Sequence, residues 1–185
     1  APSIIMWSLG NEVQEGTQWQ STSTYDDVAR NLINWVNEVD GSRLVTNGDN
    51  ELKNFSQQLV DVDTVIANAG GVVGANYANG SKYDQIHNRF PEWPIYGSET
   101  ASHVNSRGVY NVTVSQALNG DKALTAYDYS AVGWGATASS AWYDVITRDF
   151  VAGEFVWTGF DYMGEPTPNN GIGSGWVNGS NSPKH

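Results

Sequence analysis

The chain has 185 residues, of which nine are basic and twenty are acidic, so its formal net charge is −11 at pH 7. This charge repels phosphate backbones and anionic lipid headgroups, which argues against nucleic acid and membrane surfaces as partners. Because the chain contains no cysteine, disulfides and thiolate metal sites are excluded, and packing must supply the stability.

The first predicted element is a strand. Residues 3–9 form a short apolar run between Pro2 and Gly10, which is typical of a strand buried on both faces of a parallel sheet. The chain opens directly on this strand, without the basic start and cleavage site of a signal peptide. We therefore interpret the sequence as an excerpt from a longer chain.

An amphipathic helix is predicted next. Thr24 and Asp27 resemble a capping box at its start, and Gly41 ends the pattern. The apolar residues that recur at helical spacing in between are Val28, Leu32, Trp35, Val36 and Val39. This spacing predicts a helix with one apolar face.

The second strand is predicted at 44–46 and ends in the polar residues 47–49. The third strand is either 62–67 or 72–77, because the glycine pair at 70–71 leaves the boundary open.

Ser81 and Asp84 form another capping pattern, which predicts a short helix that Pro91 ends. A strand is expected over 94–99. The stretch 102–135 is rich in Ser, Asn and Gly and is longer than an ordinary connection, and loops of that length are usually functional.

A second clear helix follows this stretch and is stopped by Gly153. Its apolar positions are Ala138, Trp142, Val145, Ile146 and Phe150. The last strand is predicted over 154–160, and 169–185 has no periodicity and is predicted as a loop. This alternation of strands and helices predicts an α/β fold with a parallel sheet.

Two glutamates stand out among the acidic residues. Glu12 and Glu99 each follow an apolar strand directly and are flanked by small or amide residues. Catalytic groups of parallel barrels stand at the carboxyl ends of strands. Glycoside hydrolysis needs two carboxyl groups on either side of the anomeric carbon. The aromatic share of 12% suits either sugar stacking or a Trp-rich core.

Three ordered motifs carry a family resemblance. Residues 2–12, Pro-Ser-Ile-Ile-Met-Trp-Ser-Leu-Gly-Asn-Glu, resemble the acid/base motif of glycoside hydrolase family 2. Residues 96–102 resemble the nucleophile strand of the family, and 155–162 followed by 164–168 resemble its last barrel strand. The ending at 164–168 is most similar to the large bacterial β-galactosidases.

The resemblance implies a (β/α)8 TIM-type barrel, of which the single domain 1–185 would hold the parallel strands four to eight. It implies that Glu12 is the general acid/base and Glu99 the nucleophile of a retaining mechanism. The chain would then remove terminal β-galactosyl residues through a covalent glycosyl-enzyme. The two carboxyl groups should stand roughly 5 to 5.5 Å apart.

The same resemblance assigns further site residues. Asn11 matches the amide that binds the sugar 2-hydroxyl, with a turn amide as the alternative. Tyr77 resembles the tyrosine that donates a hydrogen bond to the nucleophile, and Trp157 should form the floor of the sugar subsite unless it packs in the core. For Trp134 and Trp142 a core position is expected rather than the site.

One departure from the family pattern concerns a histidine three residues after the nucleophile. This sequence has Ser102 there and His103 one position later, so His103 is either a partial substitute or a packing residue. No cofactor is expected. The magnesium-binding members draw ligands from strands absent here, so no metal site is predicted.

Several alternatives stay open. Within the family, β-glucuronidase and β-mannosidase chemistry share both glutamates. The chain could also be a non-catalytic carbohydrate-binding module or a structural fragment. The expected partners are a β-galactoside oligosaccharide or glycoconjugate, and either the missing barrel half and β-sandwich domains or a second copy of the chain. The resemblance alone favours a bacterial extracellular or cell-surface location.

Overall fold

The computed structural model describes residues 2–13, 22–50, 57–105, 107–111, 113 and 125–160. Strands and helices alternate along these residues. The elements are β1 (Met6–Asn11), α1 (Thr22–Asp40), β2 (Leu44–Asp49), α2 (Gln57–Asn68), β3 (Val72–Asn76), α3 (Gly80–Arg89), β4 (Ile95–Ala101), α5 (Ala138–Ile146) and β5 (Val151–Trp157). The predicted motif at 164–168 and the predicted loop at 169–185 lie outside the described residues.

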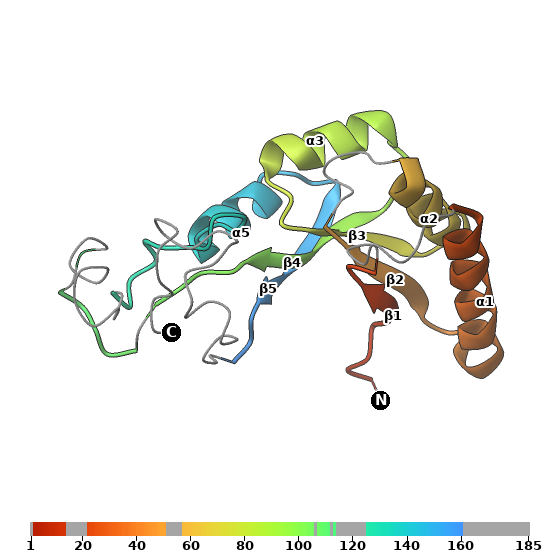
Figure 1. Cartoon of the computed structure of the whole chain (residues 1–185), viewed down its shortest axis with the longest axis horizontal. Helices are drawn as coiled ribbons and strands as arrows, with labels where there is room; N and C mark the ends of the chain where they lie inside the picture. Colours follow the sequence, from red (N-terminus) through yellow and green to blue (C-terminus); the bar gives the residue numbers. More distant parts are fainter. Residues whose placement is uncertain are drawn as a thin grey trace. The chain divides into compact units, whose positions relative to one another are not determined.

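The five strands form one sheet in the order β1-β2-β3-β4-β5 (Figure 1). The pairs β1–β2, β2–β3 and β3–β4 are parallel. After each of the first three strands, the chain therefore crosses back to the end of the sheet where that strand began, as βα units require. The predicted α/β fold with a parallel sheet is confirmed.

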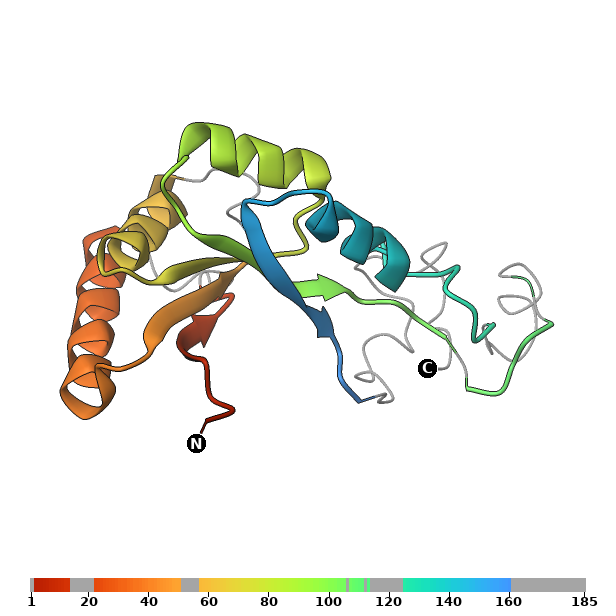
Figure 2. The same ribbon diagram turned by 180° about the vertical axis from the view of Figure 1, so that it is seen from behind.

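The chain divides into two compact units. The first contains the described residues of Ala1–Glu99 and Val145–Glu154, and the second contains those of Thr100–Asp144 and 155–160. In the first unit, helices α1, α2 and α3 lie along one side of strands β1, β2 and β3 (Figures 1 and 2).

Two apolar clusters hold the first unit together. One joins α1, β2 and α2 and consists of Ala29, Ile33, Val45, Val62, Val65 and Ile66. The other joins β3, α3 and β4 to the segment around β5 and consists of Val73, Ala75, Ala78, Tyr83, Ile86, Ile95, Val145 and Val151. These clusters hold β2, β3 and β4 against the helices, and Leu9 of β1 packs against the first cluster.

Helix α1 is present as predicted, but its start and inner face differ. It begins at Thr22, so Thr24 lies inside the helix and is not its cap. The buried residues are Ala29 and Ile33, one turn apart, whereas Trp35 and Val39 are 60% and 89% exposed. The predicted apolar stripe thus lies next to the buried face of the helix, and only some of its residues pack against the core.

The third strand is β3, Val72–Asn76, and the alternative strand at 62–67 is wrong. That segment belongs to helix α2, where Val62, Val65 and Ile66 are buried. The spacing of three and four residues places these side chains on one helical face, and the pair Gly70 and Gly71 follows the helix end.

Three predicted boundaries are also corrected. Helix α3 is capped by Asn79, whose side chain accepts from the Lys82 amide, and not by Ser81. The Ser81 hydroxyl instead accepts a hydrogen bond from Gln85. Helix α5 ends at Ile146, and β5 already begins at Val151, before the glycine that was expected to stop the helix.

Strand β1 is not buried on both faces as predicted. It occupies the edge of the sheet and pairs with β2. Trp7 is 36% exposed, and Ile5 just before the strand is 63% exposed. Among the described residues β1 has one neighbouring strand, so its other edge is unpaired.

Candidate active site

The ends of strands β1, β3 and β4 carry the candidate site, and β2 lies between β1 and β3 in the sheet. Asn11 ends β1 and Glu12 follows it, Tyr77 follows β3, and Glu99 lies near the end of β4. Because the carboxyl ends of parallel strands meet at one edge of a sheet, residues far apart in sequence converge there. The structure thus brings together four of the five site residues expected from the sequence.

A single amide joins the two glutamates. The Nδ2 atom of Asn76 donates to Glu12 Oε1 at 2.8 Å and lies 3.4 Å from Glu99 Oε2. The two oxygens therefore lie no more than about 6 Å apart, which suits the roughly 5 to 5.5 Å of a retaining glycosidase. An inverting enzyme needs roughly 6.5 to 9.5 Å to leave room for a water.

The other oxygen of Glu99 has its own donor. The Tyr77 hydroxyl donates to Glu99 Oε1, and the Tyr77 backbone amide donates to the Glu99 carbonyl oxygen at 2.7 Å. Tyr77 is thereby tied to Glu99 through both its main chain and its side chain. Hydrogen bonds to a carboxylate orient it and favour its ionised form.

Glu12 and Tyr77 both adopt left-handed backbone conformations, with φ of 48° and 54°. This region costs roughly 1 to 2 kcal/mol for residues other than glycine. Backbone hydrogen bonds to the neighbouring strands hold both residues, since the Glu12 amide donates to the Gly48 carbonyl oxygen at 2.8 Å. Such strain is concentrated where a side chain must be aimed at a fixed point.

Three contributors to the site escaped the sequence analysis. Asn76 is buried at the end of β3 and also donates to Asn11 Oδ1 at 3.0 Å. The Ser98 hydroxyl donates to Asn76 Oδ1 at 2.6 Å. Gly48 leaves room for both amides, because a Cβ there would stand 2.5 Å from Asn11 Oδ1.

Strand register is the signal that could have revealed these residues. Asn11 pairs with Gly48 across β1 and β2, and Asn76 pairs with Glu99 across β3 and β4. Once the third strand is aligned correctly, the polar residues that end consecutive strands become neighbours. Sequence patterns leave the position of that strand open, so they do not identify Asn76 as a neighbour of Glu99.

The remaining aromatic and histidine candidates belong to the second unit. Trp157 is 42% exposed and is joined to Thr158 by a cis peptide bond. His103 is mostly buried, with Nε2 3.6 Å from Asp128 Oδ1. Its Nδ1 lies 3.3 Å from Asn105 Nδ2.

The expectation that Trp134 and Trp142 lie in the core is wrong. Their exposed fractions are 42% and 52%. Helix α5 buries Ala141 and Val145 instead. These two residues are one turn apart, and Trp142 lies at the border of the buried face that they form.

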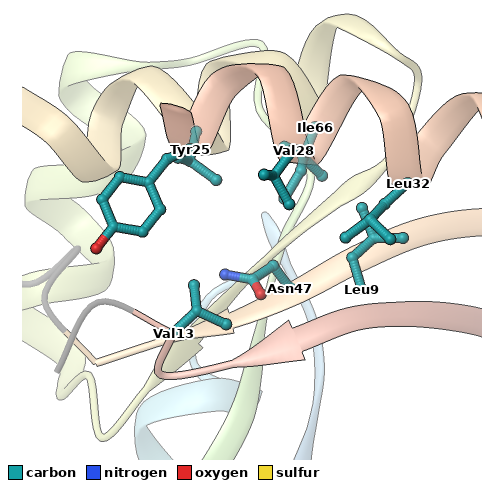
Figure 3. Close-up of a pocket in the computed structure, with 9 residues that line it drawn as sticks. Leu9, Val13, Tyr25, Val28, Leu32, Asn47 and Ile66 are labelled. Carbon is teal, nitrogen blue, oxygen red and sulfur yellow. The ribbon is translucent and has the colours of Figure 1, made fainter. Parts of the chain in front are cut away.

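An apolar pocket of about 310 Å³ lies elsewhere in the first unit (Figure 3). Its lining includes Leu9, Val13, Tyr25, Val28, Leu32 and Ile66. Neither Glu12 nor Glu99 lines it. It is a gap in the packing between α1, α2 and the strands, and none of the described residues that line it is a carboxylate, a histidine or a lysine.

Among the described residues, no group of three or more acids and histidines is arranged to hold a metal ion. In the same part of the chain, no helix has both the length and the hydropathy needed to span a membrane.

The whole chain matches a known protein family. The model for the TIM barrel domain of glycosyl hydrolases family 2 matches residues 1–185. The β-galactosidase BoGH2A of Bacteroides ovatus is 28% identical over 211 residues, which cover 90% of this chain. The chain spans 23% of the length of that curated relative.

Solved structures share the fold. A Bacteroides uniformis β-glucuronidase superimposes with a TM-score of 0.60 and 16% identity, covering 88% of this chain and 20% of that one. A putative β-galactosidase from Bacteroides fragilis gives a TM-score of 0.55 at 16% identity, covering 88% and 23%. At this identity the likeness establishes the architecture of a partial barrel.

Proposed function

Because the chain belongs to glycosyl hydrolase family 2, as predicted, we propose that it supplies both catalytic carboxyl groups of a retaining β-galactosidase. Glu12 is the general acid/base and Glu99 is the nucleophile. The observation that carries this proposal is the Asn76 amide, which contacts both carboxyl groups and limits their separation to about 6 Å. That separation leaves no room for a water on the opposite face of the sugar, as inversion would require.

In the first half-reaction, a carboxylate oxygen of Glu99 attacks the anomeric carbon. The bond from that carbon to the aglycone oxygen breaks, and the Glu12 proton moves to the departing oxygen. The products are a glycosyl ester on Glu99, a Glu12 carboxylate and the free aglycone. Tyr77 supports this step by holding Glu99 Oε1 through its hydroxyl.

In the second half-reaction, the Glu12 carboxylate takes a proton from water, and the water oxygen attacks the anomeric carbon. The ester bond to Glu99 breaks, and the sugar leaves with its original configuration after two inversions. Asn11 is exposed beside Glu12, where its amide can bind the 2-hydroxyl, a contact that strengthens in the transition state. Trp157 is proposed as the floor of the sugar subsite.

The assignment of galactose as the sugar is supported by the sequence similarity to the Bacteroides ovatus β-galactosidase, 28% over most of this chain. The Bacteroides uniformis β-glucuronidase shares the fold at 16% identity, which supports only the architecture. The chemistry at the two glutamates is the same for either sugar. Specificity for galactose or glucuronic acid depends on the groups that contact the substituents at C4 and C6 of the sugar.

The test is a panel of nitrophenyl β-glycosides, with galactose, glucuronic acid and mannose as the sugars. The chain is assayed together with the strands that complete the barrel, beside Glu12→Gln and Glu99→Gln variants. We expect galactoside turnover that falls by about 100-fold or more in each variant. Turnover of the glucuronide alone would reassign the sugar and keep the mechanism. Galactoside turnover that survives both substitutions would refute the mechanism.

A further inference from the structure

We propose that Asn76 is a positioning residue that serves the two catalytic carboxylates in turn, and that its amide follows the negative charge from Glu99 to Glu12 during the reaction. This inference rests on the proposed function and goes beyond it, because it adds a third group to the paired-carboxylate mechanism.

The side-chain nitrogen of Asn76 is surrounded by more hydrogen-bond acceptors than it has hydrogens to donate. Its Nδ2 atom carries two hydrogens, yet it faces Glu12 Oε1 at 2.8 Å, Asn11 Oδ1 at 3.0 Å and Glu99 Oε2 at 3.4 Å. One hydrogen must therefore be divided between acceptors. The Glu99 contact is the longest of the three, so the Asn76 amide holds Glu99 Oε2 less closely than it holds Glu12 Oε1.

The orientation of the amide is fixed from the other side. Ser98 donates its hydroxyl to Asn76 Oδ1 at 2.6 Å, which directs the carbonyl end away from the acids and the N–H end toward them. Asn76 is only 1% exposed, so water does not compete for its hydrogens. A donor held in this way already points toward both acids before the charge moves, so only a small displacement is needed during the reaction.

The two half-reactions place the negative charge on different carboxyl groups. Before attack Glu99 is the anion and Glu12 holds the proton, whereas in the glycosyl-enzyme Glu99 is an ester and Glu12 is the anion. The Asn76 nitrogen lies between them, at 3.4 Å and 2.8 Å. A small displacement of the amide strengthens its bond to whichever group is ionised, and such charge-assisted bonds are the stronger ones.

Burial also predicts how a substitution would act. All three oxygens around the Asn76 nitrogen belong to protein side chains, and the residue has almost no exposed surface. Asn76 therefore has no direct contact with substrate. Its loss should lower kcat and leave KM nearly unchanged, the pattern of an interaction made in the transition state.

The decisive variant is Asn76→Asp, which keeps the shape of the side chain and removes the N–H donor. Asn47→Asp is the matched control, because Asn47 is also buried, on the neighbouring strand β2, and lines the apolar pocket. Ser98→Ala is the second variant, since it leaves the donor in place and removes the hydroxyl that orients it. All are made in the protein with its complete barrel.

Two galactosides with different aglycones separate the half-reactions. A dinitrophenyl aglycone leaves without proton donation, so hydrolysis of the ester limits its turnover, whereas a methylumbelliferyl or alkyl aglycone makes the first step limiting. Rates are divided by the number of sites that a slowly turned over 2-fluoro β-galactoside labels. This division removes any loss that comes from unfolded protein.

We expect Asn76→Asp to lower kcat per labelled site by about 100-fold for both aglycones, with Asn47→Asp close to the unsubstituted protein. Ser98→Ala should lower kcat by about tenfold. If Asn76→Asp yields no labelled sites, the Ser98→Ala rate decides. An unchanged kcat in the folded variant, or a loss confined to one aglycone, would overturn the inference. Failure of the proposed function looks different, because the unsubstituted protein would then be neither active nor labelled on Glu99.

Discussion

Asn11 Oδ1 occupies the space that a side chain on Gly48 would need: a Cβ on Gly48 would stand 2.5 Å from that oxygen and 3.1 Å from Asn76 Oδ1. The Gly48 carbonyl oxygen also accepts the Glu12 amide at 2.8 Å. One residue of β2, which carries no functional group, therefore sets the position of both amides and of the acid/base glutamate.

Gly48→Ala should therefore damage the site more than the fold. We expect kcat/KM to fall by at least about tenfold and the free energy of unfolding to fall by about 1 to 3 kcal/mol, the usual cost of overpacking. Turnover and thermal denaturation measure the two effects. Gly159→Ala is the matched control, because a Cβ there meets no atom within 4 Å. Equal behaviour of the two variants would contradict the packing role of Gly48.

Tyr77→Phe removes the hydroxyl that donates to Glu99 Oε1 and keeps the ring. The nucleophile then loses one fixed donor, and its carboxylate is less firmly oriented. We expect kcat to fall by about 10- to 100-fold, within the range found for the loss of one preorganised donor. Tyr143→Phe serves as control, since Tyr143 is 65% exposed on α5. Full activity of Tyr77→Phe would show that the contact is dispensable.

A buried acid pair links α2 to β2. Asp49 and Asp63 are both fully buried, and burial raises the pKa of Asp63 well above its usual value, with the charge of Asp49 and their hydrogen bond adding to the rise. The folded state therefore keeps a proton on Asp63 that the unfolded chain releases above about pH 3.9. The stability that this proton confers is present at low pH and is lost as the pH rises through the raised pKa.

Asp63→Asn should flatten this pH dependence, because the amide stays neutral and can still donate to Asp49. Thermal denaturation between pH 4.5 and pH 8 tests it. The unsubstituted protein is expected to lose up to about 1.4 kcal/mol per pH unit from this group, and the variant should gain stability at the upper end. Glu92→Gln, an exposed acid, is the control and should leave the slope unchanged. A slope that persists in Asp63→Asn would place its origin elsewhere.

The exposed apolar face of α1 and the edge strand β1 predict self-association of the isolated chain. Val39 is 89% exposed and Trp35 is 60% exposed on the same helix, and β1 has a single described neighbour in the sheet. Such surfaces favour pairing with another chain. Sedimentation should show oligomers that Trp35→Glu reduces, whereas Asn34→Glu, the same charge on an exposed neighbour, should not. A monomer at all concentrations would refute this expectation.

Much of the fold could be predicted because short stretches of sequence carry the pattern of each strand and helix. The apolar runs at 3–9 and 94–99 lead into Glu12 and Glu99, although Gly10 and Gly97 lie inside β1 and β4 and do not end them. The interior of α2 was ambiguous for a physical reason. Val62, Val65 and Ile66 suit either a short strand or a helix, and only their burial on one face of the helix distinguishes the two.

The contacts within the site depend on strand register, which short-range patterns do not specify. Only the register of the strands places Gly48 beside Asn11 and Asn76 beside Glu99. The inner face of α1 was misjudged because Val28, Leu32, Trp35 and Val39 form a regular stripe of their own. The chain buries the adjacent stripe of Ala29 and Ile33 instead, which packs with Val45 of β2 and with Val62, Val65 and Ile66 of α2.

The central claim is that Glu99 becomes covalently bound to the sugar. The direct measurement is mass spectrometry of peptides after reaction with 2-deoxy-2-fluoro-β-galactosyl fluoride, whose fluorine slows hydrolysis of the glycosyl-enzyme so that it accumulates. With the barrel complete, one fluorogalactosyl group is expected on the peptide that contains Glu99, and none in Glu99→Gln. A label on another residue, or inactivation without any covalent label, would contradict the assignment of Glu99 as the nucleophile.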